Sequence, residues 1–85
     1  MTKFTYTVTD PEGIHARPAG ALVKLAKEFT CKVTIDRAGK TADAKRVFAI
    51  MGLGVKCGDE LTFTCEGEDE AAAAEKLAAG LSGIL

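Results

Sequence analysis

The hydrophobic periodicity of this chain changes along its length, and that change limits the possible folds more than any other feature. Phe4, Tyr6 and Val8 alternate with threonines, and this period of two predicts a half-buried strand. After about residue 16 the spacing becomes helical, with an apolar stripe made of Pro18, Leu22, Leu25, Ala26 and Phe29. We therefore expect an amphipathic helix from about Ala16 to Phe29.

Both periods recur in the rest of the chain. Lys32–Asp36 and Thr41–Ala44 alternate on either side of a turn at residues 37–40, which predicts a hairpin, and Glu60–Glu66 predicts a further strand. From Asp69 onward the spacing is helical again, following acidic residues that suit a helix N-terminus. The expected apolar stripe of this last helix is Ala74, Leu77, Ala78, Leu81 and Leu85.

The apolar run Val47–Met51 stays ambiguous, because a short run bounded by glycine fits either a buried strand or a short helix. Without it, the expected order of elements is β, α, β, β, β, α. Helices interspersed with hairpin-connected strands predict an antiparallel sheet covered on one face, which is the α+β class.

Length and charge exclude several classes of function. The 85 residues suffice for one core, so we expect one domain spanning residues 1–85 and exclude a two-domain enzyme. The chain has eleven Lys and Arg against twelve Asp and Glu, so it lacks the excess of positive charge that nucleic-acid binding needs. The longest charge-free stretches have nine residues, whereas a membrane span needs about twenty. With no cleavable signal at the N-terminus, we expect a cytoplasmic protein without membrane insertion.

The three cysteines match no zinc-ligand spacing, and we expect reduced thiols. Cys31 and Cys65 fall on the apolar phase of two expected strands, which places them in the core. Cys57 lies beside Gly58 in a turn, where a side chain can be exposed. We expect neither a metal site nor a cofactor.

His15, the only histidine, lies directly before the expected helix. Backbone N–H groups in the first turn of a helix lack intrahelical partners and carry partial positive charge, so they attract anions. The same charge opposes protonation of the imidazole and favours its neutral, nucleophilic form. Arg17 and these N–H groups would then stabilise a phosphoryl group attached to the ring. A histidine in this position is also often a polar surface or capping residue, and position alone leaves both interpretations open.

The run Gly13–Ala19 closely resembles the active-site signature of the HPr family, the histidine phosphocarriers of the bacterial phosphoenolpyruvate:sugar phosphotransferase system. Gly39-Lys40, Ala44–Val55 and Gly58–Glu60 recur at the family's spacing, so the resemblance covers essentially the whole chain. It implies an HPr-like open-faced β-sandwich, with a four-stranded antiparallel sheet covered on one face by three helices. In that fold Val47–Met51 is a short second helix.

The family's mechanism implies that His15 accepts a phosphoryl group on Nδ1 from enzyme I and passes it to a histidine of a IIA domain of a sugar permease. Arg17 would assist, within a phosphate-binding segment made of Ala16, Arg17 and Pro18. Such a protein is a phosphoryl carrier rather than an enzyme in its own right, and we expect a monomer. Two alternatives are an HPr paralogue in a regulatory phosphorelay and a docking module that regulates an enzyme or transcription factor. The presence of both His15 and Arg17 speaks against the docking module.

A partner-docking surface is expected beside the histidine, made of Gly20, Lys24, Lys27, Arg46, Val47, Phe48 and Met51. Gly20 would let a partner approach closely, although a merely suboptimal helix residue explains it equally well. The lysines could steer an acidic partner, although exposed helix lysines are ordinarily only solvated. Phe48 and Met51 belong to an apolar run too short to bury all its members, so one or both should stay exposed.

Arg46 departs from the family pattern. Many HPr proteins of Gram-positive bacteria carry a regulatory serine at this position, and its phosphorylation blocks transfer. Arginine offers no hydroxyl to a serine kinase and is a poor N-cap, so we expect a carrier without a serine switch. Arg46 then either adds to the basic docking surface or is neutral surface.

Overall fold

The computed structural model describes residues 1–9 and 16–84, with side chains for residues 1–9 and 18–81. The elements follow one another as β1 (Thr2–Thr7), α1 (Ala16–Ala26), β2 (Lys32–Arg37), β3 (Lys40–Asp43), α2 (Val47–Met51), β4 (Glu60–Glu66) and α3 (Glu70–Ile84). Each strand and helix expected from the pattern is present. The ambiguous run Val47–Met51 is a helix, as the family resemblance implied.

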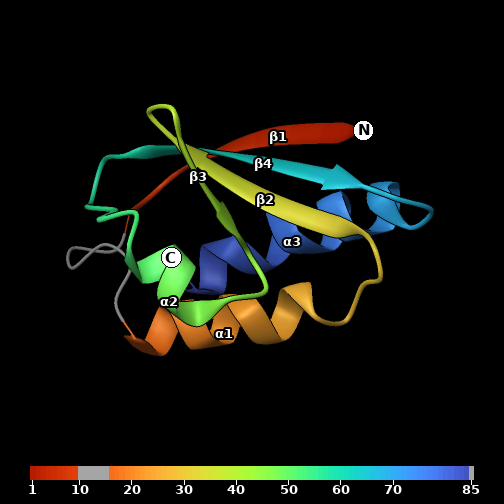
Figure 1. Ribbon diagram of the computed structural model, residues 1–85, viewed down its shortest axis with the longest axis horizontal. Helices are drawn as coiled ribbons and strands as arrows, with labels where there is room; N and C mark the ends of the chain where they lie inside the picture. Colours follow the sequence, from red (N-terminus) through yellow and green to blue (C-terminus); the bar gives the residue numbers. More distant parts are fainter. Residues whose placement is uncertain (10–15, 85) are drawn as a thin grey trace.

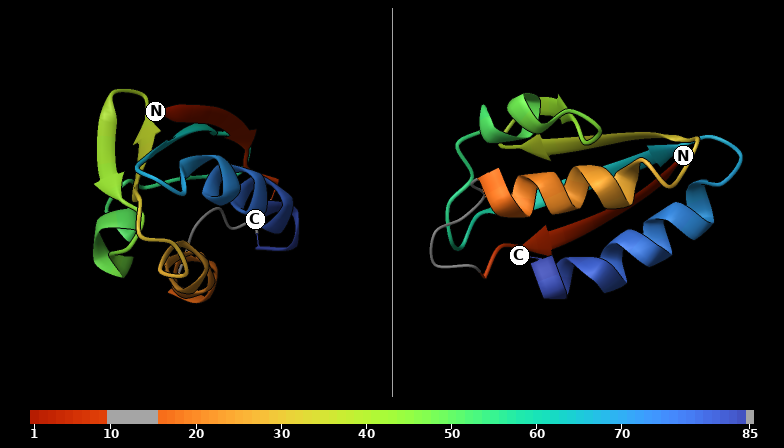
Figure 2. Two further views of the ribbon diagram at one scale, coloured as in Figure 1. Left: turned by 90° about the vertical axis from the view of Figure 1, so that its right-hand side faces the viewer. Right: turned by 90° about the horizontal axis from the view of Figure 1, so that it is seen from below.

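The four strands form one antiparallel sheet in the order β1-β4-β2-β3. Because β4 pairs with both β1 and β2, Phe63 has Phe4 on one side and Ile35 on the other. The rings of Phe4 and Phe63 stack with their centroids 5.0 Å apart. Helices α1, α2 and α3 all lie on the same face of the sheet (Figures 1 and 2). The predicted α+β fold with one covered face is confirmed.

The core fills the space between the sheet and the helices. Strand residues contribute to it alternately, as a period of two requires: Leu61 and Phe63 are fully buried, whereas Thr62 between them is partly exposed. The helices contribute Ala19, Leu22, Val23, Ala26, Ile50, Ala73, Ala74, Leu77 and Leu81. The expectations for the cysteines are confirmed, since Cys31 and Cys65 are buried, Cys57 is exposed and all three are free thiols.

Two details of the helices were predicted wrongly. α1 ends at Ala26, because the N–H groups of Glu28 and Phe29 bond to carbonyls three residues back and close the last turn. Phe29 still packs against the core from the following turn, which explains why the apolar stripe ran past the helix.

The second error concerns α3, in which Ala78 is exposed and Ala73 is buried instead. α3 turns Ala73, Leu77 and Gly80 inward, and a Cβ on Gly80 would lie only 2.8 Å from Cδ2 of Leu25 in α1. Alanine is common on both faces of a helix, so its spacing is a weak guide to orientation. No helix within the described residues is long and apolar enough to cross a membrane.

Candidate functional site

The phosphoryl-bearing residue proposed from the sequence, His15, lies outside the described residues. α1 begins at Ala16, so the backbone of Ala16, Arg17 and Pro18 forms its first turn. This turn contains no acidic residue, so no carboxylate of its own competes for its N–H groups. Pro18 is buried and lies in the first turn, where the absence of an N–H group costs nothing.

The chain is held by well-defined contacts on both sides of residues 10–15. Upstream, the N–H of Val8 donates to the carbonyl of Asp59 at 2.9 Å, and the N–H of Gly58 donates to the carbonyl of Val8 at 2.8 Å. Downstream, Ala19 and Leu22 of α1 are fully buried. The fold therefore fixes Val8 on one side of residues 10–15 and α1 on the other.

A groove of about 460 Å³ runs between the second half of α1 and the start of α2. Its lining residues are Val23, Lys27, Lys45, Arg46, Val47, Phe48 and Ala49. Three of the seven are basic and the other four are apolar, so the groove suits an acidic partner surface that also presents an apolar side chain.

The basic residues around the groove are held differently. Lys24 is exposed on α1, and Lys27 is exposed directly after this helix. The ammonium group of Lys45 donates to the carbonyl of Phe29 at 2.8 Å, which joins the segment before α2 to the turn that follows α1. Arg46 is 80% exposed, and its Nε lies 3.9 Å from Oδ2 of Asp43, a distance that makes a weak ion pair.

The apolar part of the predicted docking surface is exposed as expected. The exposed fraction is 87% for Phe48 and 38% for Met51, whereas Val47 is half-buried. A Cβ added to Gly20 would meet no atom within 4 Å, so this position opens to solvent. Their predicted proximity to His15 concerns a residue outside the described ranges.

Arg46 occupies the N-cap position of α2, with φ −126° and ψ 114°, and its side chain makes no capping hydrogen bond. Its expected weakness as a cap is therefore confirmed. Two contacts that shape the site were not predicted: the bond from Lys45 to Phe29 and an ion pair between Arg37 and Asp59. Both join residues distant in sequence, which periodicity and motif spacing do not report.

Among the described residues, no cluster of histidine, cysteine or acidic side chains is arranged to hold a metal ion.

Residues 2–82 match the family model described as the phosphorylation site of the PTS HPr component. The phosphocarrier protein HPr of Buchnera aphidicola is 46% identical over 70 residues, which cover 82% of each chain. The HPr-like protein Crh of Bacillus subtilis is 45% identical over 67 residues, 79% of each chain.

Solved structures agree with these sequence matches. A Mycoplasma histidine-containing phosphocarrier protein superposes with a TM-score of 0.91 at 30% identity, covering 99% of this chain and 98% of the other. The crystal structure of Crh, described as a domain-swapped dimer, superposes with a TM-score of 0.78 at 38% identity, covering 100% and 98%. With its four-stranded open sheet, its three helices on one face and a family match over nearly its whole length, this chain belongs to the HPr family of phosphocarriers of the phosphotransferase system.

Proposed function

We propose that residues 1–85 act as a single HPr domain that carries phosphoryl groups in the sugar phosphotransferase system. His15 accepts the phosphoryl group on Nδ1 from phosphorylated enzyme I and passes it to a histidine of a IIA domain. The observation that carries this proposal is the start of α1 at Ala16, immediately after the only histidine of a chain matched to the HPr phosphorylation-site family.

The first turn of α1 supplies the electrostatics that a carrier needs. Its N–H groups and the Arg17 guanidinium stabilise the added negative charge, and interactions at a helix end contribute about 0.3–2 kcal/mol. That range is small enough for the phosphoryl group to leave again. Because donor and acceptor are histidines of other proteins, this chain contributes positioning and charge stabilisation.

The groove between α1 and α2 and the residues around it form the docking surface in this proposal. Exposed Phe48 and Met51 provide its apolar centre, with Val47 beside them. Lys24, Lys27 and Arg46 add exposed positive charge to this surface. Gly20 leaves room for the partner's backbone over α1. Enzyme I and the IIA domains would therefore use complementary acidic and apolar surfaces in turn.

The proposal includes the absence of a serine switch at Arg46 and a location in the cytoplasm, where the three free thiols stay reduced. Incubation of the purified protein with HPr kinase and ATP tests the first point. Phosphate incorporated at any residue would contradict it.

We also propose that the protein acts as a monomer. The domain-swapped dimer of Crh shows that a relative can assemble differently. Sedimentation equilibrium at several concentrations tests the monomer, and a concentration-independent dimer mass would exclude it.

The second candidate function is that of a regulatory paralogue of HPr, and the 45% identity to the HPr-like protein Crh supports it. Both candidates accept phosphate at His15 and differ in the acceptor. Transfer from the phosphorylated protein to individual IIA domains distinguishes them: rapid transfer to a sugar-permease IIA domain supports sugar uptake, and transfer only to regulatory acceptors supports the paralogue.

Incubation with enzyme I and labelled phosphoenolpyruvate tests the proposal directly. We expect one phosphate per molecule, labile in acid and stable in base, and none on the His15→Ala variant. Arg17→Ala should accept phosphate more slowly, whereas Lys3→Ala, which removes an exposed charge from β1, should match the wild type. An unlabelled wild-type protein, in a preparation where another HPr is labelled, would exclude the carrier function.

A further inference from the structure

We propose that Arg37 is a positioning residue for phosphoryl transfer. Through Asp59 and Leu53 it holds α2, the helix on which partners dock, in a fixed position relative to the end of β1, the strand that precedes His15. This inference rests on the proposed carrier function. Arg37 is the last residue of β2 and lies outside the predicted docking surface.

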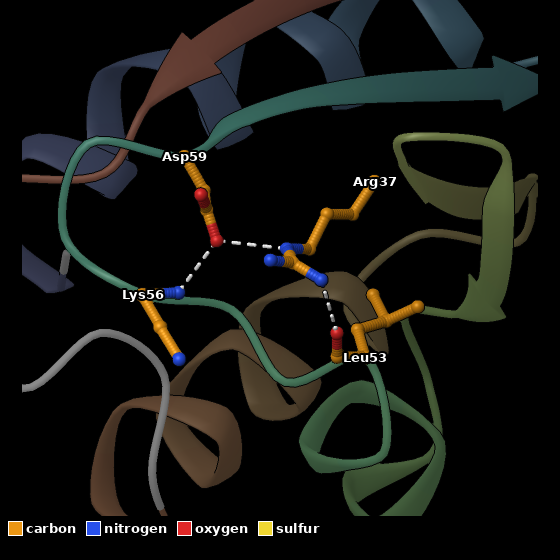
Figure 3. A network of polar contacts seen from close by, with 4 residues as sticks. All are labelled: Arg37, Leu53, Lys56 and Asp59. Carbon is orange, nitrogen blue, oxygen red and sulfur yellow. Dashed lines mark hydrogen bonds and ion pairs between the residues drawn. The ribbon is translucent and has the colours of Figure 1, made fainter.

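One guanidinium makes two directed contacts with the loop between α2 and β4. Nε of Arg37 donates to Oδ2 of Asp59 at 2.7 Å, and Nη1 donates to the carbonyl of Leu53 at 3.0 Å (Figure 3). The Arg37 and Asp59 side chains are 27% and 28% exposed, so the ion pair is partly shielded from water. A planar guanidinium with several fixed donors suits this double contact, whereas an ammonium group does not.

The contact with Leu53 fixes the end of α2. Leu53 lies two residues after Met51, the last residue of α2, and is buried. Its own N–H donates to the carbonyl of Ile50 at 3.1 Å, so the chain leaves the helix in a tight turn. Through this carbonyl Arg37 is connected to the helix that carries the exposed Phe48.

The contact with Asp59 fixes a second turn. Oδ2 of Asp59 also accepts the N–H of Lys56 at 2.8 Å, and the N–H of Asp59 donates to the carbonyl of Lys56 at 3.0 Å. The Lys56 N–H, followed by the Arg37 guanidinium, lowers the pKa of the Asp59 carboxyl below its usual value, so the group is charged at neutral pH.

The same turn holds Val8 and Thr9, which directly precede residues 10–15. Asp59 and Gly58 exchange backbone hydrogen bonds with Val8, and Sγ of Cys57 lies 3.8 Å from the carbonyl of Thr9. Val8 is itself buried. Figure 3 shows Arg37 bridging Leu53 and Asp59 in the 52–59 loop. Because this loop also contacts Val8 and Thr9, Arg37 connects the end of α2 to both residues.

This arrangement has a specific functional consequence. A partner docks on α2 but must place its own histidine against His15, so the rate of transfer depends on how α2 and the His15 segment are placed relative to each other. Small errors in the placement of reacting groups lower rates steeply. Loss of Arg37 should therefore slow transfer while leaving the docking surface, and hence the affinity for enzyme I, unchanged.

The test compares Arg37→Ala, Arg37→Lys and Asp59→Ala with Lys40→Ala, which removes an exposed charge from the same hairpin. Single-turnover phosphorylation by enzyme I gives the transfer rate, and titration calorimetry gives the affinity. We expect transfer to fall on the order of tenfold for the first three variants, with dissociation constants within about twofold of wild type. The double variant Arg37→Ala/Asp59→Ala should be no slower than either single variant, because the pair acts as a unit.

A second readout does not depend on transfer. The NMR resonances of His15, Val8 and Thr9 should shift in Arg37→Ala and stay in place in Lys40→Ala. Unchanged transfer and unchanged resonances in a folded Arg37→Ala would overturn the inference and leave the carrier function intact. Weaker affinity at an unchanged transfer rate would also overturn it, since Arg37 would then be a docking charge. If wild type accepts no phosphate, the carrier function fails, and the resonances alone decide whether Arg37 positions the segment.

Discussion

Phe48 and Ile50 lie two residues apart on α2 and have opposite environments, since Phe48 is 87% exposed whereas Ile50 is fully buried. Two residues correspond to about 200° around a helix, so the two side chains point in nearly opposite directions. Ile50 joins α2 to the core, and Phe48 presents an aromatic ring to solvent at the edge of a basic groove. Exposed aromatic residues in such surroundings are typical centres of protein interfaces.

Phe48→Ala should therefore weaken docking and leave stability unchanged. We expect the free energy of unfolding to change by less than about 0.5 kcal/mol, because few native contacts are lost. The KM for phosphorylation by enzyme I should rise about tenfold, as for a truncated interface hot spot. Ile50→Ala is the matched control: it should lose about 2–5 kcal/mol of stability and keep a near-normal KM where it remains folded. A normal KM for Phe48→Ala would remove Phe48 from the docking surface.

Gly20→Ala should have opposite effects on stability and on phosphoryl transfer. Gly20 lies inside α1, and a Cβ at this position meets no atom within 4 Å. The substitution should stabilise the protein by about 0.5–1 kcal/mol, because alanine favours the helix. If a partner's backbone approaches closely here, transfer should slow despite the added stability. Thermal unfolding and transfer rates measured side by side check this, and faster or unchanged transfer would show that Gly20 is only a suboptimal helix residue.

Gly67→Ala should be strongly destabilising. Gly67 has φ 150°, and a Cβ on it would lie 2.8 Å from Cβ and 2.9 Å from Cα of Cys31. Backbone strain and overlap with a buried neighbour together should cost about 2–5 kcal/mol. Gly39→Ala provides the comparison, since Gly39 has φ 90° with nothing within 4 Å and should suffer the backbone strain alone. Chemical denaturation of both variants measures the difference, and equal losses would show that the Cys31 contact is easily relieved.

Acid should weaken the connection between α3 and the chain before β2. The Asp69 carboxylate accepts the N–H groups of Thr30 and Cys31, each at 2.9 Å, and these bonds, that of Thr30 above all, lower the pKa of Asp69. A carboxyl with a lowered pKa stabilises the fold above its unfolded pKa of about 3.9, and this stabilisation is lost as the pH falls through the folded value. Urea unfolding from pH 7 to pH 3 should show Asp69→Asn less stable than wild type near pH 7, with the difference shrinking below about pH 4. A difference independent of pH would contradict this linkage.

The extent of successful prediction follows from the range of the interactions involved. Glu60–Glu66 was predicted with the bounds that β4 has, because alternation over seven residues is a strong local signal. Periodicity alone left Val47–Met51 undecided, and the family resemblance settled it. Ala78 was misplaced because alanine discriminates poorly between core and surface. The Arg37–Asp59 pair joins residues 22 positions apart, and nothing local to either residue indicates its partner.

The three thiols should differ sharply in reactivity, since only the thiolate is nucleophilic and access controls the rate. Burial, followed by a hydrogen bond with Asp69, raises the pKa of Cys31 to about 11, and burial also raises the pKa of Cys65. Cys57 is exposed beside Thr9. Ellman's reagent at pH 8 should therefore modify one thiol per native molecule and three after denaturation, with Cys57→Ser lowering the native value to zero. Above about pH 9 the Cys31 thiol ionises in the unfolded chain but stays neutral in the folded protein, so stability should decline as the pH rises toward the raised pKa of about 11. Rapid modification of two or three thiols in the native protein would show that the core around Cys31 and Cys65 opens readily.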